Sequence, residues 1–255
     1  MKKLLTMLSI ILLSSCAKEY IEGEGPVIKD KELQIDPFTK ISVEGPFTVN
    51  ITQGTEQKVT ITTEQNIIDR TNKVVVDGVW QIRLQEGDYK NILPKINVTV
   101  PNLTSFVSLN EAKVFVSEWD CGDDDLHLEA SAGKLSFDPP VVAKNINITI
   151  SKGAEIFTPK VSTNAIDVAS DNCRDLSITG STTKLNITHT GNGGINTRAL
   201  QADDVTVVIT NGSKVNVTAN KTLNATVNGY GRIGYYGDPV ITKSINGTGE
   251  LNHYK

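Results

Sequence analysis

The sequence predicts an all-β protein, a parallel β-helix with coils of about 17–22 residues. A short turn phrase built on Gly or Asn recurs, starting at positions 131, 151, 170, 190, 210, 227 and 245, at intervals of 20, 19, 20, 20, 17 and 18. Between these turns, short stretches alternate aliphatic and polar residues. No stretch after the first fifteen residues has the pattern of a long amphipathic helix.

Stacking explains why such a repeat folds. A single coil of twenty residues cannot bury its aliphatic side chains, but stacked coils pair every strand and enclose an apolar interior. Aromatic residues make up only 5% of the chain, which suits an interior too narrow for large rings. A β-sandwich also has short strands at regular spacing and is the alternative, although it gives no reason for one turn phrase to return seven times.

Residues 1–15 are predicted to be a signal peptide of the lipoprotein type. Lys2 and Lys3 precede an apolar run at 4–13, which is too short to span a bilayer as a helix. Small residues then lead directly to Cys16, as in the lipobox of bacterial lipoproteins. We therefore expect Cys16 to carry the lipid, and the partner it implies is a membrane. An ordinary signal peptide with an incidental Cys16 is the alternative.

Residues 16–34 are charged, contain Gly and show no periodicity, so they are expected to be a flexible tether. The folded domain is expected over residues 35–250. Its N-terminal half, 35–120, contains alternating strands and a hairpin signal at Asp77 and Gly78. Residues 67–70 can form no more than one helical turn. The repeats fill the C-terminal half, 121–250.

Three stretches carry a resemblance to a known family: Phe38 to Val49, Ile96 to Leu103, and the Gly- and Tyr-rich ending from Val227 to Val240. They resemble the auto-transporter adhesin family with a head GIN domain, which is common in lipoproteins of Bacteroidota. The resemblance covers about residues 35–250. It implies a right-handed parallel β-helix and an adhesin, and it brings no catalytic residues.

Candidate chemical groups are few. His127, His189 and His253 lie 62 and 64 residues apart and are expected to be surface residues without a metal or catalytic role. An acidic cluster lacks the order of a calcium loop, so a solvated corner is expected and a weak divalent site is the alternative. This cluster comprises Asp120, Asp123, Asp124 and Asp125. No catalytic residue, metal ligand or cofactor is therefore predicted.

Cysteine spacing argues against a disulfide. Cys121 and Cys173 are 52 residues apart, more than two coils in a solenoid, so two free thiols are expected.

The sequence contains many Asn-x-Ser/Thr triplets and a group of tyrosines near its C-terminal end, and neither predicts a catalytic site. The triplets are expected to reflect Asn and Thr alternating on the outer faces of strands; they begin at Asn97, Asn102, Asn147, Asn186, Asn211, Asn216, Asn224 and Asn246. Tyr230, Tyr235 and Tyr236 are expected to cap the last coil, with a sugar-stacking platform as the alternative.

A carbohydrate-active enzyme, a polysaccharide lyase or hydrolase, is the alternative function because many β-helix proteins degrade polysaccharides. Such an enzyme needs paired carboxylates or a basic group beside acids, and only Asp203 and Asp204 are adjacent. Arg174, Arg198 and Arg232 are spaced 24 and 34 apart, off the coil period. We therefore expect a non-enzyme.

The predicted function is a lipid-anchored binding or structural head of the cell envelope, an adhesin for a glycan or a protein. The predicted location is the outer membrane, on its periplasmic or its exposed side. A passive envelope spacer is a third hypothesis. The net charge of −4 argues against nucleic acid as a partner.

Overall fold

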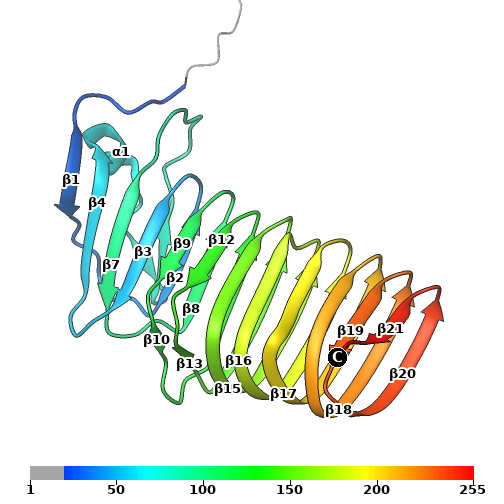
Figure 1. Cartoon of the computed structure of the whole chain (residues 1–255). Coiled ribbons are helices and arrows are strands. Elements are labelled where there is room, and N and C mark those ends of the chain that lie inside the picture. Colours follow the sequence, from blue (N-terminus) through cyan, green and yellow to red (C-terminus); the bar gives the residue numbers. More distant parts are fainter. Residues whose placement is uncertain (1–19) are drawn as a thin grey trace, which may run out of the picture.

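The chain winds into stacked coils whose strands pair in parallel with those of the neighbouring coils (Figure 1). The computed structural model describes residues 20–255. Most coils have three sides, here called face A, face B and face C. The recurring turn phrase lies at the corner where face A ends and face B begins. The predicted β-solenoid is confirmed.

Face A contains one strand from each coil. In sheet order, it comprises β6 (Val79–Ile82), β2 (Lys40–Glu44), β8 (Ser105–Leu109), β11 (Leu126–Ser131), β14 (Asn145–Ser151), the last parts of β15 (Glu155–Asp171), β16 (Asp175–Thr190), β17 (Gly194–Asn211) and β18 (Lys214–Gly229), and β20 (Val240–Gly247). Its parallel register places equivalent residues of successive coils side by side, about 4.8 Å apart.

Face B is the second long side. It comprises β1 (Val27–Glu32), β4 (Lys58–Glu64), β7 (Lys95–Val100), β3 (Thr48–Gln53), β9 (Lys113–Val116), β12 (Lys134–Phe137), the first parts of β15 to β18, β19 (Arg232–Tyr236) and β21 (Glu250–His253). Face C is short and consists of β10 (Trp119–Asp120), β13 (Val141–Val142) and the middle parts of β15 to β18.

The N-terminal end differs from the rest of the solenoid. Strands β1, β4 and β7 pair antiparallel there, and α1 (Gln65–Arg70) packs beside β4. Strand β5 (Val75–Val76) forms the predicted hairpin with β6; Asp77 and Gly78 have φ of 51° and 72°, as a type I′ turn requires. Among residues 20–255, no helix is long and apolar enough to cross a membrane.

The interior is one continuous apolar core of inward-facing Ile, Val and Leu residues from every face. The expectation of an interior too narrow for large rings is wrong for the first coils. Trp80, Trp119 and Phe106 are fully buried, and Phe106 packs edge-on against Trp119 with ring centroids 5.1 Å apart. From β14 onward the buried side chains are aliphatic or small, apart from His189.

Backbone conformation explains the turn phrase. Each of its seven copies contains a residue with positive φ, where Gly and Asn are favoured. These residues are Ala132, Lys152, Gly153, Asn172, Gly191, Asn211, Gly229 and Gly247.

The predicted tether is wrong for the residues of it that are described. Ile21 bridges to Tyr89, and residues 27–32 form β1, which extends the sheet beyond β4. Leu33 is buried in the core. The folded domain therefore starts earlier than residue 35, because this segment covers an edge of face B that would otherwise be exposed. The predicted signal peptide and Cys16 lie outside the described residues.

Candidate functional site

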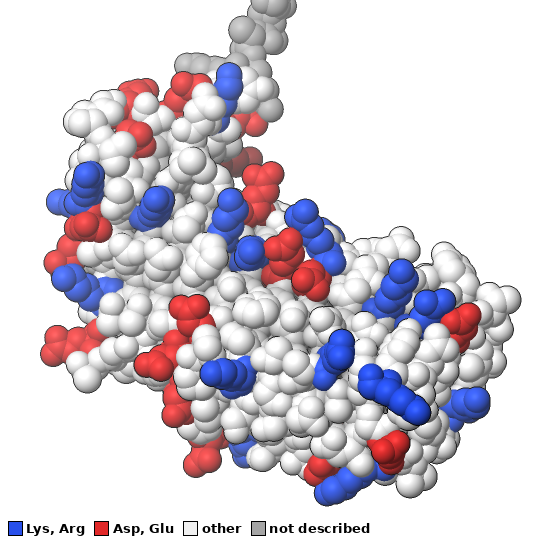
Figure 2. Space-filling model, viewed as in Figure 1, with Lys and Arg blue, Asp and Glu red and all other residues white. Residues whose placement is uncertain are grey.

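A groove of about 400 Å³ follows the corner between face A and face B over several coils. We call it the corner groove. Its lining residues are Pro46, Phe47, Thr48, Leu93, Glu111, Ala112, Lys113, Ala132, Gly133, Lys134, Gly153, Glu155 and Arg174. Figure 2 shows acidic and basic side chains close together in the hollow where the N-terminal end meets the solenoid. Leu93, which borders the groove, is 77% exposed.

Coil register brings the charged residues of the corner groove together. Lys113, Lys134 and Glu155 each begin a face B strand and occupy the same position in three successive coils. Each follows a corner that contains a residue with positive φ. The first residue of each strand therefore points outward at the equivalent position of its coil. The interval of 21 residues between these positions is visible in the sequence and is the signal that could have predicted this row.

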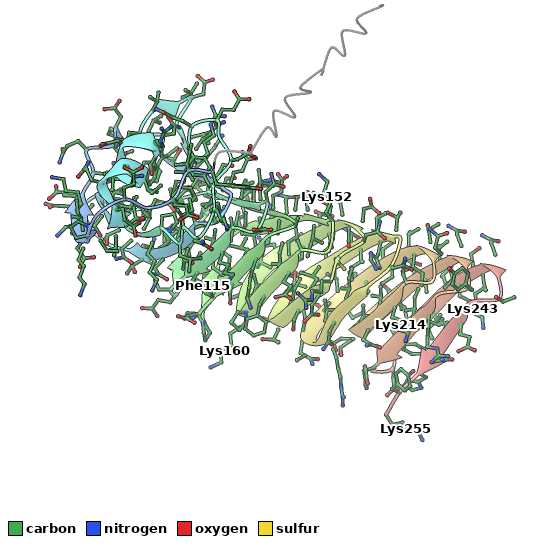
Figure 3. All side chains as sticks on the ribbon, turned by 90° about the horizontal axis from the view of Figure 1, so that it is seen from above. Phe115, Lys152, Lys160, Lys214, Lys243 and Lys255 are labelled. Carbon is green, nitrogen blue, oxygen red and sulfur yellow. The ribbon has the colours of Figure 1, made fainter. Side chains whose placement is uncertain are left out.

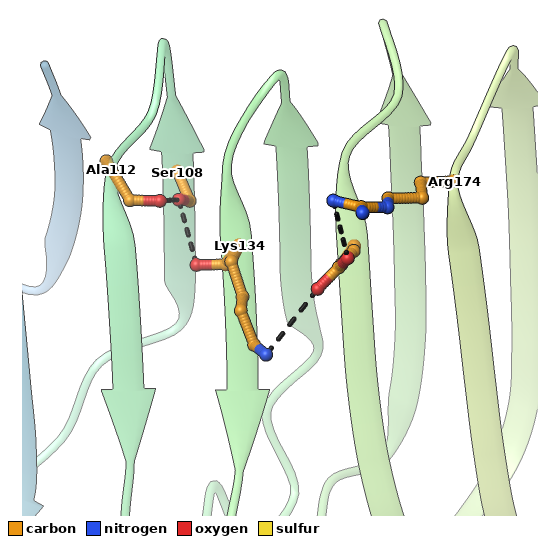
Figure 4. Close-up of polar contacts among 5 residues, drawn as sticks. Ser108, Ala112, Lys134 and Arg174 are labelled. Carbon is orange, nitrogen blue, oxygen red and sulfur yellow. Dashed lines mark hydrogen bonds and ion pairs between the residues drawn. The ribbon is translucent and has the colours of Figure 1, made fainter.

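One carboxylate in the groove holds two cations. Glu155 lies 3.5 Å from the amine of Lys134 and 3.2 Å from the guanidinium of Arg174, which approach it from opposite sides (Figure 4). Arg174 is 75% exposed, so solvent screens this pair. Among the described residues, Lys113 has no ion pair. With Lys113, Lys134 and Arg174 against Glu111 and Glu155, the lining of the groove has one more positive than negative charge.

The floor of the groove is tightly built. The hydroxyl of Ser108 is buried and lies 3.0 Å from the carbonyl oxygens of both Ala112 and Lys134, which ties two coils together beneath the corner. A Cβ at Gly133 would lie 2.6 Å from the carbonyl oxygen of Ser108, so only Gly fits at that point. The lysine positions above this floor are therefore supported by fixed backbone.

Two exposed aromatic rings stand beside the groove on face B. Phe115 and Phe157 are 38% and 44% exposed and belong to the row of outward residues next to the charged one. Ser136 occupies the coil between them in the same row. Phe115 projects from the edge of the solenoid opposite to Lys152 (Figure 3). We call the three residues Phe115, Ser136 and Phe157 the aromatic row; sequence reasoning did not single them out.

The histidines are placed differently from one another. His127 is partly exposed, 3.7 Å from Glu129. His253 stacks on Tyr235, with centroids 4.7 Å apart. The expectation of a surface residue is wrong for His189, which is completely buried in the inward row of face A. Burial lowers its pKa. Sequence spacing did not reveal this because His replaces an aliphatic residue in that row.

The acidic cluster forms a solvated corner, as expected. Asp120 accepts a hydrogen bond from the backbone N–H of Gly122, and Asp125 accepts one from Asn145. Within the described part of the chain, no group of three His, Cys, Asp or Glu residues is arranged to hold a metal ion.

The acids considered for catalysis are engaged at the surface. Asp203 lies 2.9 Å from the amine of Lys221, whose hydrogen bond and charge lower the pKa of Asp203. Asp204 accepts a hydrogen bond from Thr222. The two carboxylates therefore have separate partners.

The three arginines have unrelated positions. Arg174 lines the corner groove, Arg232 pairs with Glu250 at 2.9 Å, and the guanidinium of Arg198 lies 4.5 Å from the ring centre of Tyr236. Tyr235 stacks over the inward row of the last coils, which agrees with the expected cap, whereas Tyr230 is 68% exposed.

Polar ladders and free thiols agree with expectation. Amide hydrogen bonds link Asn50 to Asn97 and Asn228 to Asn246 across neighbouring coils. Cys121 and Cys173 are both buried and unpaired.

Fold and site together define a class: a β-solenoid with an open, charged groove and an outward aromatic row, and no arranged metal site among residues 20–255. The family model described as "Putative auto-transporter adhesin, head GIN domain" matches residues 37–239, and the chain belongs to this family. The resemblance inferred from the sequence is thereby confirmed. No curated protein matches the chain.

Solved structures share the fold. A putative lipid binding protein from Parabacteroides distasonis superimposes with a TM-score of 0.84 at 19% identity, covering 93% of this chain and 100% of its own. A putative adhesin from Parabacteroides merdae gives 0.80 at 18% identity, covering 92% and 99%. A putative adhesin from Bacteroides fragilis gives 0.64 at 21% identity, covering 92% and 100%.

Proposed function

We propose that the protein is a non-enzymatic binding head of the cell envelope, an adhesin that is anchored to the outer membrane by acylation of Cys16. The family description supports the adhesin role and a location in the envelope. The residues before and at Cys16 support the anchor. The head then stands in water while the acyl chains bury themselves in the membrane.

The observation that carries the binding role is the continuity of the corner groove with the aromatic row. Together they form an elongated surface on rigid, hydrogen-bonded strands, with charged groups on one side and apolar rings on the other. Exposed aromatic residues beside unsatisfied charge are typical of recognition surfaces. Binding of a glycan or a protein at this surface requires no catalytic group.

The anchor is tested by replacing Cys16 with Ser in the producing cell. We expect the unaltered protein to fractionate with membranes and to incorporate labelled palmitate, and C16S to lose both properties. Release of the unaltered protein as an unlipidated soluble species contradicts the anchor.

The binding role is tested on intact cells. Protease shaving followed by detection of the head shows whether it is exposed, and adhesion of the purified head to glycan arrays and host-type matrix proteins measures binding. We expect loss of the head on shaving and saturable binding without product release. A head protected from protease on intact cells, or turnover of a bound polysaccharide, overturns the proposal.

A further inference from the structure

The positive charge of the corner groove and the spacing of the aromatic row are complementary to a linear acidic glycan. This inference deepens the proposed function and rests on it. We propose that face B binds an extended polyuronate chain that runs along the solenoid axis, across the strands, over Phe115 and Phe157 and beside Lys113 and Lys134.

Lys113 and Lys134 pair directly across neighbouring strands, and like charges in that relation repel each other. Lys134 turns toward Glu155 in the next coil, at 3.5 Å, which leaves the side facing Lys113 open. An anion between the two amines removes the repulsion. A carboxylate fits, because each of its oxygens can accept from one ammonium group.

Phe115 and Phe157 are two coils apart, a separation of about 10 Å. Ser136 between them is short, so the rings stand as two separate platforms rather than one packed cluster. In an extended β-1,4-linked glycan, alternate sugars present the same face, and their repeat has about the length of two coils. Two sugars of such a chain can each cover one ring.

Lys113 precedes Phe115 by two residues on β9, and Glu155 precedes Phe157 by two residues on β15. Side chains two residues apart point to the same side of a strand, about 7 Å apart. The charged row and the aromatic row therefore run side by side along the axis. The carboxylate of the sugar over Phe115 then lies next to Lys113. The carboxylate of the sugar over Phe157 lies next to Glu155, which is paired with both Lys134 and Arg174, so these three side chains together have one excess positive charge.

The local charge also gives the ligand a preferred position. Beyond Lys134, the charged row continues with Glu155, whose charge Lys134 and Arg174 neutralise, and then with Asp175, which repels a polyanion. The opposite direction leads from Lys113 to Thr48 and Lys95. The bound stretch of the ligand is therefore placed over β7, β3, β9, β12 and the first residues of β15, where Phe157 lies, and it ends before Asp175.

The experiment measures calorimetric binding of the mature chain to a hexamer of β-1,4-mannuronate and to β-1,4-mannohexaose, which has the same backbone without carboxylates. We expect the mannuronate to bind at least about tenfold more tightly, and its affinity to fall as salt rises from 50 to about 200 mM because the lysine contacts are exposed.

Variants separate the two rows. Phe115→Ala and Phe157→Ala are each expected to weaken mannuronate binding about tenfold, in line with the value of stacking on an exposed aromatic ring. Lys113→Gln is expected to weaken it about fivefold and to reduce its salt dependence, while leaving the weak mannohexaose binding unchanged. The matched control is Lys214→Gln, which removes a charge from the same row further along face B. It is expected to bind as the unaltered chain does.

Several results overturn this proposal. They are equal affinity for the two hexamers, no binding of mannuronate, equal loss in Lys214→Gln, or binding of anionic phospholipid vesicles that depends on Lys113 but not on the phenylalanines. Thermal melts of all variants exclude misfolding as the cause of a loss. Binding of another glycan or a protein in the adhesion assay would leave the proposed function intact while the polyuronate assignment fails.

Discussion

Ser170 and His189 face each other on neighbouring coils of face A, in the row of side chains that points into the core. His189 is 0% and Ser170 5% exposed. Among the described residues, the two ring nitrogens of His189 have no hydrogen-bond partner. The hydroxyl of Ser170 also has none. In the next coil the same position is occupied by Ile209. A polar pair that includes one titratable group therefore lies between Ile150 and Ile209 in this row.

This pair makes stability depend on pH. Burial lowers the pKa of His189 below its ordinary 6.5, against smaller opposing effects of the backbone groups of Gly193 and Ser170 and of the charge of Asp171. Below about pH 6.5 the unfolded chain binds a proton at this residue that the folded chain does not, so the free energy of unfolding falls as pH falls. The contribution is fully present above that pH, and its slope below it is at most about 1.4 kcal/mol per pH unit.

We expect His189→Leu to remove this acid sensitivity and to change stability at pH 7.5 by no more than about 1 kcal/mol, since it replaces unpaired polar atoms with apolar ones. Urea unfolding at pH 5 and 7.5 measures both effects. His127→Leu, at a partly exposed site on the same face, is the control and should retain the pH dependence. An unchanged pH dependence in His189→Leu would show that other groups cause it.

The thiols are expected to be unreactive in the folded protein. Burial raises the pKa of Cys121 to about 11 and also raises that of Cys173, so almost no thiolate is present at pH 8. Iodoacetamide should label neither residue without denaturant, and both in 6 M guanidinium. Mass spectrometry of the alkylated peptides makes the measurement. Rapid labelling of either cysteine in the native protein contradicts the buried positions described above.

Corner glycines differ in what they tolerate. At Gly180, with φ of 124°, a Cβ would lie 2.2 Å from the carbonyl oxygen of Val161 in the preceding coil. At Gly153, with φ of 73°, it would meet nothing within 4 Å. Gly153→Ala should therefore cost only the left-handed backbone, about 1–2 kcal/mol, and Gly180→Ala clearly more. Chemical denaturation of both variants tests the order; equal losses would contradict it.

In the last coil, a charged side chain occupies a position that is apolar and buried in the preceding coil. Lys243 follows Ala225 in the inward row of face A, between Ile241 and Ile245, which are both 39% exposed. An inward-pointing charge on an edge strand prevents pairing with another sheet. We expect Lys243→Val to promote self-association of β20, detected by light scattering at increasing concentration.

The control for this prediction is Lys184→Val. Lys184 also lies on face A, but its strand, β16, is paired on both sides, with β15 and with β17. It should stay monodisperse to the same concentrations as the unaltered chain. Association of Lys184→Val to the same extent as Lys243→Val would attribute the effect to surface hydrophobicity rather than to the open edge.

Much of the fold follows from local patterns. The turn phrase predicted the corners because positive φ selects Gly and Asn there, and the Asp77–Gly78 hairpin followed from the same physics. The strand β1 was missed because its side chains are mostly exposed and show no alternation, and its partner, β4, lies about thirty residues further along the chain. A strand that pairs with a segment distant in the sequence shows no local sequence pattern from which that pairing can be predicted.

The sequence by itself determined the solenoid, its period, the free thiols and the family, because each of these depends on intervals along one chain. Only the tertiary structure decided which residues meet across coils. It placed Lys113 beside Lys134, set Phe115 and Phe157 on one row, and buried His189. Coil lengths vary between about 17 and 22 residues. An error of one residue turns a side chain from the surface to the core, so register had to be observed.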